Sequence, residues 1–285
     1  MRFIDMTKLR PQMRAFTAKL GRLQREALSQ PSEAERRMFL RRTHGVLADV
    51  RDALRSVSNG KCWYTESENP GALDDVDHFR PKLSVAGEDH AGYFWLAFDW
   101  WNFRYACQIA NRGNVHPETR VVGGKRDHFP LLPGSVRATS PAHSTEREKP
   151  VLLDPAVRED AEAIVYTGEG QPSVHPDLKN NAVAEQRFET SRLLYHLNWP
   201  SFADDRRALI RRLRETVNDV DRLLRTMPHD LTLIRRDRVV WNKLRRLAAM
   251  MVPGAPYSAT ARDFLRTQRY RWWIEAIVLR LGERG

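Results

Sequence analysis

Apolar residues recur at helical spacing through residues 1–57. Two series follow steps of three or four: Phe16, Leu20, Leu23 and Ala27, and later Val46, Val50 and Leu54. Such spacing places one apolar stripe along a helix. Pro31 interrupts the pattern, and Ser32 is a favourable cap for a new helix. We therefore predict a helical N-terminal arm made of two helices that meet near residues 30–32.

The segment 186–285 shows the same periodicity over a longer stretch. After Ser201, a candidate N-cap, one apolar stripe continues through Leu209, Leu213, Val217, Val220 and Leu224. Two further helices are predicted over 231–251 and 259–281, because each apolar pattern ends at Gly or Pro. Arginine pairs recur along the first two of these helices, at 206–207, 211–212, 235–236 and 245–246. The segment therefore predicts an Arg-rich helical C-terminal region.

Residues 58–185 lack this periodicity. Gly, Pro, Asn and Asp are scattered through them, which is typical of short elements joined by loops. The aromatic run at 93–103 contains three tryptophans, Trp95, Trp100 and Trp101, which we expect in the core rather than as base-stacking platforms. The predicted fold is mainly α with a small α+β insert. We divide it into an arm (1–57), a compact insert (58–135), a loop-rich connection (136–185) and the C-terminal region (186–285).

Charge is distributed unevenly along the chain, which has 47 Lys and Arg against 36 Asp and Glu. Residues 1–60 hold 13 basic and 6 acidic side chains, and 186–285 hold 21 and 11, whereas 61–185 hold 13 and 19. Basic surfaces attract polyanions, so the predicted partner is nucleic acid, ahead of an anionic membrane surface. Arginine-rich helices with merely solvated faces are the alternative explanation.

The remaining composition excludes several classes of protein. A hydrophobic content of 41% is too high for a disordered chain, and 2 Cys are too few for a disulfide-stapled domain. No apolar run reaches the roughly 18 residues of a membrane span, and the first residues lack the apolar segment of a signal peptide. We therefore expect a cytoplasmic globular protein with no membrane partner.

Candidate chemistry lies in the acidic insert, where Asp77 is directly followed by His78 at the end of a β-type run. At a strand end both side chains can reach one site, where the carboxylate holds a hard cation and the imidazole accepts a proton from water. A later asparagine can add a metal ligand or fix the histidine loop. Taken alone, a histidine is more often structural, and an asparagine more often belongs to a turn.

Several segments resemble one family when they are taken in order. They are CWYTE at 62–66, VDHFRPK at 76–82, YFWLAFDWWNF at 93–103, CQIAN at 107–111, HFP at 128–130, LLDP at 152–155 and SRLLYHLN at 191–198. This order resembles the HNH, or ββα-metal, endonucleases, and more closely the PtuB-like nuclease subunits of Septu and retron-associated antiphage systems. The resemblance covers about residues 58–215.

The resemblance implies a role for each matching position. His78 would be the general base, and Asn102 would orient the loop that carries it. Asp77 and Asn111 would be ligands of Mg²⁺ or Mn²⁺. Phosphate contacts are implied for three basic residues, Arg80, Lys82 and Lys125.

One departure concerns the zinc knuckle of the family, in which two CxxC pairs hold a structural zinc ion. Here Cys62 is followed by Thr65, and Cys107 by Ala110. Threonine is a poor zinc ligand and alanine is none. We expect that structural Zn²⁺ is absent and that Cys62 and Cys107 are buried thiols at a degenerate zinc site. The alternative is a zinc ion retained with the help of a nearby histidine, His116 or His128.

The predicted function is metal-dependent hydrolysis of nucleic-acid phosphodiester bonds by an HNH core over 58–135, with DNA the favoured substrate. The resemblance further implies an effector of antiphage defence that is controlled by an ATPase partner subunit. The alternatives are a nuclease specific for RNA, such as tRNA, and a catalytically silent nucleic-acid-binding or assembly subunit.

Overall fold

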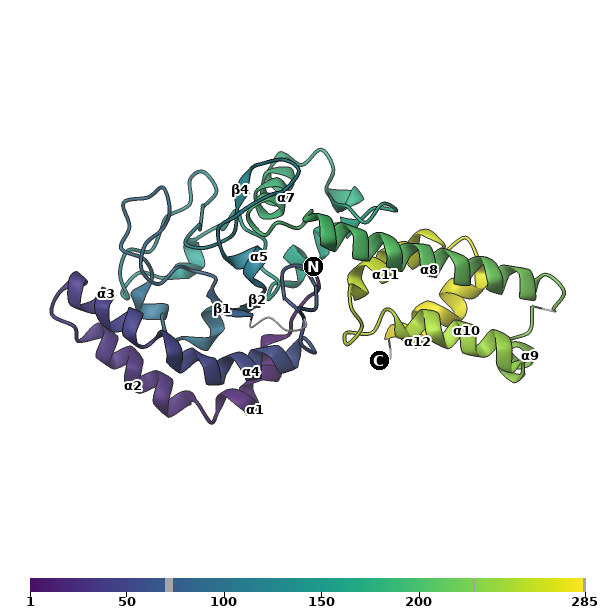
Figure 1. Cartoon of the computed structure of the whole chain (residues 1–285), viewed down its shortest axis with the longest axis horizontal. Helices are drawn as coiled ribbons and strands as arrows, with labels where there is room; N and C mark the ends of the chain where they lie inside the picture. Colours follow the sequence, from purple (N-terminus) through teal and green to yellow (C-terminus); the bar gives the residue numbers. More distant parts are fainter. Residues whose placement is uncertain (70–73, 228, 284–285) are drawn as a thin grey trace. The chain divides into compact units, whose positions relative to one another are not determined.

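The computed structural model describes residues 1–69, 74–227 and 229–283 (Figure 1). The chain forms two compact units: unit 1 comprises Met1–Ile164 and Val174–Leu197, and unit 2 comprises Val165–Ser173 and Asn198–Gly285. About half of the chain is helical, and the strands of the described residues form small two-stranded sheets. The expectation of a mainly α chain with a small β component is therefore confirmed.

Four helices form the N-terminal arm in the described residues: α1 (Arg10–Met13), α2 (Thr17–Leu28), α3 (Glu33–Arg42) and α4 (Leu47–Val57). The break expected near residues 30–32 is confirmed. Ser32 caps α3, because its Oγ accepts from the Glu35 backbone N–H at 3.2 Å and donates to the Glu35 carboxylate at 2.6 Å. The expectation of only two helices is wrong. A 3-10 turn at His44–Val46 separates α3 from α4, and Gly45 in this turn disfavours a continuous helix.

Two strands and a short helix follow one another in the order β–β–α. β1 (Asp75–His78) pairs antiparallel with β2 (Phe103–Ala106), and α5 (Gln108–Asn111) comes directly after β2. In this register Asp77 lies opposite Arg104, and His78 lies opposite Phe103. The sequence positions that carry the predicted chemistry therefore lie on adjoining elements.

The arm and this pair of strands share one hydrophobic core. Leu20 of α2 and Val50 and Leu54 of α4 are buried in the same cluster as Phe103 of β2. Figure 1 shows α2 and α4 running along one side of β1 and β2. Each fully buried side chain of this size contributes about 1.5–3 kcal/mol. The arm therefore helps to hold the strands that carry the predicted site in place.

The tryptophans of the 93–103 run are only partly in this core. Trp95 is buried, as expected, and Trp100 is half-buried. Trp101 is 43% exposed and stacks on Trp100 with ring centroids 4.4 Å apart. The expectation of a core position is therefore wrong for Trp101, because the 3-10 turn at Trp100–Asn102 directs this side chain outward.

The chain leaves α5 for a short excursion and then returns to it. The excursion is an antiparallel hairpin of β3 (Asn114–Val115) and β4 (Val122–Gly123). After the hairpin, the backbone N–H of Lys125 donates to the carbonyl of Ala110 at 2.8 Å. Gly124 permits this return, because its φ is +103° and a Cβ there would lie 1.9 Å from the Arg112 carbonyl oxygen. Lys125 is thereby placed beside α5.

The remaining elements of the first 197 residues are short, apart from one helix. They are α6 (Arg158–Glu162), a hairpin of β5 (Ile164–Tyr166) and β6 (Pro172–Val174), and α7 (Ala182–Leu194). Asn181 caps α7, because its Oδ1 accepts from the backbone N–H groups of Val183 and Ala184 at 3.1 Å.

Unit 2 is a helical layer around its own core. Its helices are α8 (Pro200–Leu224), α9 (Leu231–Arg236), α10 (Arg238–Ala249), α11 (Ser258–Thr267), a π-helical segment (Ile274–Leu279) and α12 (Arg280–Glu283). The apolar stripe expected on α8 is confirmed: Leu209, Leu213, Val217, Val220 and Leu224 are all buried. None of the described helices is both long enough and apolar enough to cross a membrane.

Three sequence expectations for these helices are corrected. Ser201 does not cap α8: Trp199 is the N-cap, and Pro200 occupies the first helical position, which suits its fixed φ. The helix expected over 231–251 is two helices, because the Asp237 side chain caps a new one through the N–H groups of Val239 and Val240. The helix expected over 259–281 stops at Thr267, and the chain turns before the π-helical segment.

Candidate active site

Asp77 lies in a buried polar cluster of unit 1. Its Oδ2 accepts a hydrogen bond from the Tyr64 hydroxyl at 2.6 Å, and its Oδ1 accepts from Lys125 Nζ at 3.0 Å. Burial raises the pKa of Tyr64 well above its usual value, and the negative charge of Asp77 adds to this effect. Tyr64 therefore stays protonated and remains the donor. The carboxylate thus has one phenol and one cation as partners.

The two lysines that the resemblance assigns to phosphate differ in their surroundings. Lys125 is fully buried, and its Nζ also donates to the His78 carbonyl oxygen at 2.6 Å. In this conformation a contact with phosphate would require it to leave Asp77. Lys82 is half-buried, and burial lowers its pKa to about 8, against an opposing contribution from Asp77. Lys82 therefore loses its positive charge just above neutral pH.

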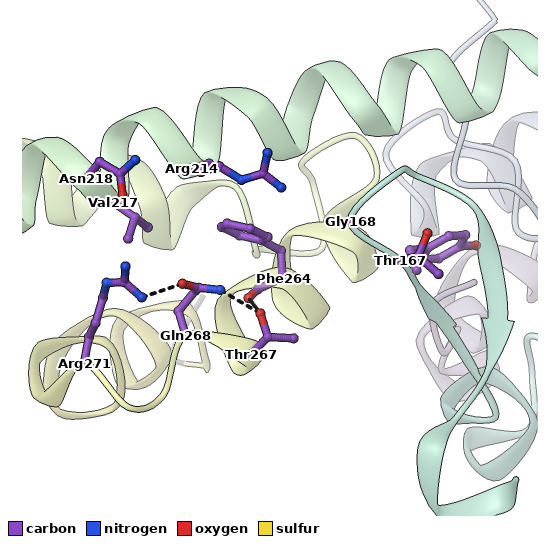
Figure 2. Close-up of a pocket in the computed structure, with 10 residues that line it drawn as sticks. Thr167, Gly168, Arg214, Val217, Asn218, Phe264, Thr267, Gln268 and Arg271 are labelled. Carbon is purple, nitrogen blue, oxygen red and sulfur yellow. Dashed lines mark hydrogen bonds between the residues drawn. The ribbon is translucent and has the colours of Figure 1, made fainter.

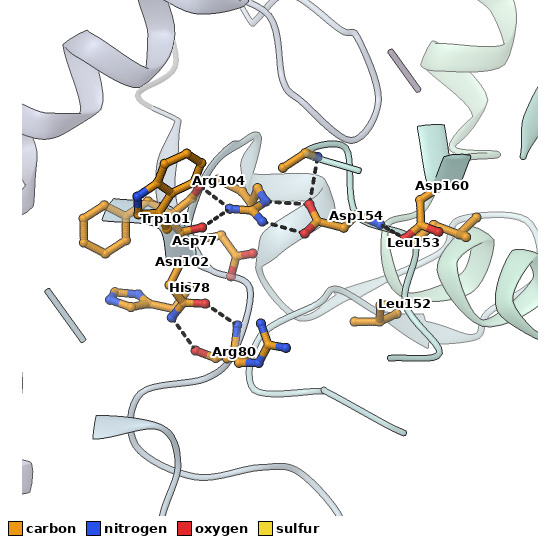
Figure 3. Close-up of polar contacts among 12 residues, drawn as sticks. Asp77, His78, Arg80, Trp101, Asn102, Arg104, Leu152, Leu153, Asp154 and Asp160 are labelled. Atoms are coloured by element: carbon orange, nitrogen blue, oxygen red, sulfur yellow. Dashed lines mark hydrogen bonds and ion pairs between the residues drawn. The ribbon is translucent and has the colours of Figure 1, made fainter. Parts of the chain in front are cut away.

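His78 is held by a backbone carbonyl. Its Nε2 lies 2.9 Å from the oxygen of Ala97, and its ring meets Phe103 edge-on with centroids 5.1 Å apart. Because a carbonyl oxygen only accepts, Nε2 carries the proton, and Nδ1 is the basic nitrogen of the neutral ring. Figure 3 shows the His78 ring and the Asp77 carboxylate pointing in different directions, as adjacent strand residues do.

Asn102 clamps the chain that follows His78. Its Oδ1 accepts from the Arg80 backbone N–H at 2.8 Å, and its Nδ2 donates to the Arg80 carbonyl at 2.9 Å (Figure 3). Its own carbonyl oxygen accepts from the Phe79 N–H at 2.9 Å. The Asn102 amide also donates to the Leu96 carbonyl at 3.3 Å, so its side chain joins the Arg80 backbone, 22 positions away, to the turn just before it. This arrangement fixes the loop immediately after His78.

Asn111 contacts a different carboxylate of the same strand. Its Nδ2 donates to Asp75 Oδ2 at 3.0 Å, and Arg112 pairs with the same carboxylate at 2.9 Å. Asp75 lies two residues before Asp77, so both point to one face of β1. Within the described residues, no three His, Cys, Asp or Glu side chains lie close enough together to hold a metal ion. A metal ion held here would therefore need ligands other than three such side chains.

Arg80 is engaged by a carboxylate from the loop before the LLDP segment. Its Nε donates to Glu148 Oε2 at 2.6 Å. The other oxygen of Glu148 accepts from the Tyr93 hydroxyl at 2.6 Å and from the Ala138 N–H at 3.0 Å. The Glu148 side chain is buried, whereas that of Arg80 stays 20% exposed. Arg80 is therefore fixed in direction but keeps some contact with solvent.

The positions that correspond to the zinc knuckle lie together. Cys62, Thr65, Cys107 and Ala110 are all buried, and the Thr65 hydroxyl lies 3.8 Å from Cys107 Sγ. The two thiols are hydrogen-bonded. This bond and burial raise the pKa of Cys107, whereas at Cys62 burial is outweighed by hydrogen bonds that lower the pKa. His116, a candidate replacement ligand, accepts instead from the backbone N–H groups of Glu118 and Thr119.

Sequence reasoning missed several residues that hold the site together. Tyr64 binds Asp77, and Tyr195 stacks on Tyr64 with ring centroids 4.0 Å apart. The guanidinium of Arg104 makes two hydrogen bonds to Asp154, at 2.6 and 2.5 Å (Figure 3). Three of these four side chains belong to the segments that carry the resemblance, so the segment order was the available signal. The order of the segments did not indicate which of these side chains contact one another.

Comparison with known proteins gives one informative similarity. Septu protein PtuB of Bacillus mycoides (strain KBAB4) is 29% identical to this chain over 168 residues, which cover 55% of this chain and 49% of that protein. The chain thus spans about half the length of the curated relative that it matches. No family model matches the sequence. Over this part of its sequence the chain is therefore similar to a Septu PtuB protein.

Proposed function

We propose that unit 1 is a metal-dependent nuclease of the HNH class and that the chain is the effector of a Septu-type antiphage system. The observation that carries this proposal is the clamp of Asn102 on the backbone just after His78. This contact supports the loop-orienting role that the resemblance implies for Asn102, and it lies within a β–β–α order of elements. No helical or strand periodicity requires such a contact.

His78 would act as the general base through Nδ1. Its Nε2 proton is committed to the Ala97 carbonyl, which fixes the ring and stabilises the imidazolium formed when Nδ1 takes a proton from water. The hydroxide would then form a new P–O bond as the P–O bond to one sugar oxygen breaks, and the departing sugar oxygen would take a proton from water. Arg80 and Lys82 lie two and four positions after His78 in the chain and would stabilise the negative charge that develops on the phosphate oxygens.

Asp77 and Asn111 would hold the Mg²⁺ or Mn²⁺ ion. These ions prefer oxygen ligands, and Mg²⁺ is commonly held by one or two protein groups together with waters and substrate phosphates. Each Asp77 oxygen has a second lone pair beyond its hydrogen bond, and Asn111 binds Asp75 through its amide nitrogen, so its oxygen can serve as a ligand. The bound ion would supply charge stabilisation at the phosphate.

A role in antiphage defence rests on the similarity to Septu protein PtuB. Unregulated cleavage of nucleic acid would harm the cell that makes the protein. We therefore include in the proposal a partner subunit that controls the nuclease, with an ATPase as the class that the resemblance implies.

A catalytically silent binding subunit is the second candidate, and one observation favours it. Lys125 already supplies Asp77 with a positive partner inside the protein. The negative charge of such a carboxylate is already balanced, so it does not require a metal ion as its counter-charge.

Cleavage assays separate the two candidates. The full chain, alone and with the protein encoded beside it, is incubated with plasmid, single-stranded DNA and RNA in Mg²⁺ or Mn²⁺. We expect cleavage that His78→Ala abolishes and that His175→Ala leaves intact, because His175 only caps the 3-10 turn at Pro176–Leu178. Nucleic-acid binding without cleavage in every combination would favour the silent subunit and refute the nuclease.

A further inference from the structure

Trp101 presents an exposed aromatic ring next to the proposed active site. Its side chain is 43% exposed although it stacks on Trp100, with ring centroids 4.4 Å apart and 26° between the ring planes. Trp100 is half-buried and packs in turn against the hydrophobic core of unit 1. Trp100 therefore supports the indole of Trp101 from the protein side, and the exposed part of that indole is its other face and its edge.

The backbone of Trp101 is fixed at both of its polar groups. Its N–H donates to Asp99 Oδ1 at 3.0 Å, and its carbonyl oxygen accepts from Arg104 Nη1 at 2.8 Å (Figure 3). Asp99 caps the 3-10 turn that carries Trp101, and Arg104 is itself held by its buried pair with Asp154. A ring on such a fixed turn loses little conformational freedom when a ligand stacks on it, which favours binding.

The exposed ring lies beside a basic segment of unit 1. The guanidinium carbon of Arg10 is 5.8 Å from the centroid of the Trp101 ring. Residues 8–14 contain three exposed basic side chains, those of Lys8, Arg10 and Arg14, and no acidic residue. Cations next to exposed aromatic surface bind single-stranded nucleic acid, because the phosphates contact the cations and the bases stack on the rings. This charge favours a nucleic-acid strand over an apolar protein surface as the ligand of the ring.

Trp101 is also close to the proposed general base. Phe103 lies opposite His78 in the strand pair, and antiparallel partners have Cα atoms about 4.5–5.5 Å apart. The two residues from Trp101 to Phe103 span at most about 7 Å. The Cα atoms of Trp101 and His78 are therefore within about 13 Å of each other. Since a strand of duplex DNA rises about 3.4 Å per nucleotide, this distance corresponds to a few nucleotides.

We propose that Trp101 stacks on an unpaired base of the substrate strand, a few nucleotides from the bond that is cut, with Arg10 on an adjacent phosphate. In a continuous duplex the neighbouring bases cover both faces of each base, so only an unpaired or displaced base can use this ring. The preferred substrate is therefore single-stranded or locally unpaired. That the strand is a substrate rests on the proposed nuclease function, whereas the stacking contact does not.

Fluorescence anisotropy of the full chain in EDTA tests the contact independently of cleavage. The probes are an oligothymidylate of about 15 nucleotides and an oligomer of equal length that lacks every base. We expect the wild type to bind the oligothymidylate about fivefold or more tightly than the abasic oligomer. Trp101→Ala should remove this difference, and Trp101→Phe should retain most of it. Arg10→Gln should weaken the binding of both oligomers by similar factors, because both carry the phosphates.

Two further probes define the strand. A duplex of the same length should bind to the wild type and to Trp101→Ala with affinities within about twofold of each other, because its bases are paired and stacked. An oligouridylate of the same length shows whether the tighter ligand is DNA or RNA. Trp101→Ala should weaken the binding of the oligouridylate as it weakens that of the oligothymidylate, because every base has an aromatic face.

Tyr270 of unit 2 provides a matched control. Its ring is 75% exposed, and the guanidinium carbon of Arg271 is 4.4 Å from the ring centroid. Arg271, however, donates to Asp221 at 2.6 Å and to Gln268 at 2.5 Å (Figure 2). The cation beside Tyr270 is therefore already balanced by a carboxylate. Tyr270→Ala should change the affinity for oligothymidylate less than about twofold.

Crosslinking of the wild type tests the same contact without a substitution. An oligomer in which 5-iodouracil replaces every thymine, irradiated in the complex, should crosslink to Trp101, as mapped by mass spectrometry. The proposal is overturned if the wild type binds both oligomers alike, if Trp101→Ala keeps the preference for bases, if Tyr270→Ala loses as much affinity, or if no crosslink falls within residues 100–102. A stacking contact without cleavage in any assay would instead refute the nuclease and leave this contact standing.

Discussion

The Arg104–Asp154 pair offers the sharpest test of how unit 1 is held together. The side chains are 5% and 10% exposed, and two hydrogen bonds of 2.6 and 2.5 Å join them. Arg104 also donates to the Trp101 and Phe103 carbonyls. Asp154→Asn leaves the buried guanidinium without its counter-charge. Breaking a buried pair in this way costs about 3–5 kcal/mol, so we expect the free energy of unfolding of unit 1 to fall by that amount.

Urea unfolding at neutral pH, followed by tryptophan fluorescence and circular dichroism, measures this change. The matched control is Glu162→Gln, which breaks the exposed Arg158–Glu162 pair at 3.7 Å and should cost less than about 0.5 kcal/mol. The double variant Arg104→Met/Asp154→Leu should be about 1–3 kcal/mol less destabilised than the sum of its single variants. A loss below about 1 kcal/mol for Asp154→Asn would refute the reasoning, because the pair would then behave like a surface pair.

Three further predictions concern the candidate site. Asn102→Ala removes two hydrogen bonds to the Arg80 backbone and should lower the free energy of unfolding by about 1–3 kcal/mol. Cleavage by this variant should fall while its affinity for nucleic acid stays unchanged. Unchanged cleavage would contradict the role of Asn102 in positioning the loop after His78. Thr65→Cys/Ala110→Cys rebuilds four cysteines around one point and should bind one zinc ion per chain by elemental analysis, whereas stoichiometric zinc in the wild type would contradict the degenerate site. Since the pKa of Lys82 is about 8, its charge is lost as the pH rises from 7 to 9, so nucleic-acid affinity by fluorescence anisotropy should weaken over this range. Lys82→Gln should flatten this pH dependence of affinity. An equal pH dependence in the variant would exclude Lys82 as its source.

Local signals in the sequence predict the helices and strands of this fold better than they predict the contacts between them. The Ser32 cap and the apolar stripe of α8 follow from neighbouring residues, and both are confirmed. The break at Asp237 was missed because apolar residues keep helical spacing across it. The break at Gly45 was missed because the apolar series that starts at Val46 does not indicate where the preceding helix ends. Capping side chains and flexible residues therefore set where these helices begin and end, which periodicity alone did not indicate.

The candidate site depends on pairings that no local pattern contains. Tyr64 and Lys125 lie 13 and 48 positions from Asp77, so only the folded chain brings them to its carboxylate. The order of motifs assigns Asn102 to the loop that follows His78, and in the structure the Asn102 side chain contacts the Arg80 backbone in that loop. It did not indicate that Asn111 would contact Asp75, because a one-turn helix leaves the direction of its last side chain open.

The excursion between α5 and Lys125 has a consequence for how this protein can diverge. The chain leaves at Asn111 and comes back beside Ala110, and Gly124 allows the two passes to touch. Closing a somewhat longer loop adds only a few tenths of a kcal/mol. Relatives can therefore lengthen or shorten the exposed tip at 117–120 without displacing the lysine. Alignments with relatives that share this excursion should accordingly tolerate gaps there while Gly124 and Lys125 keep their place.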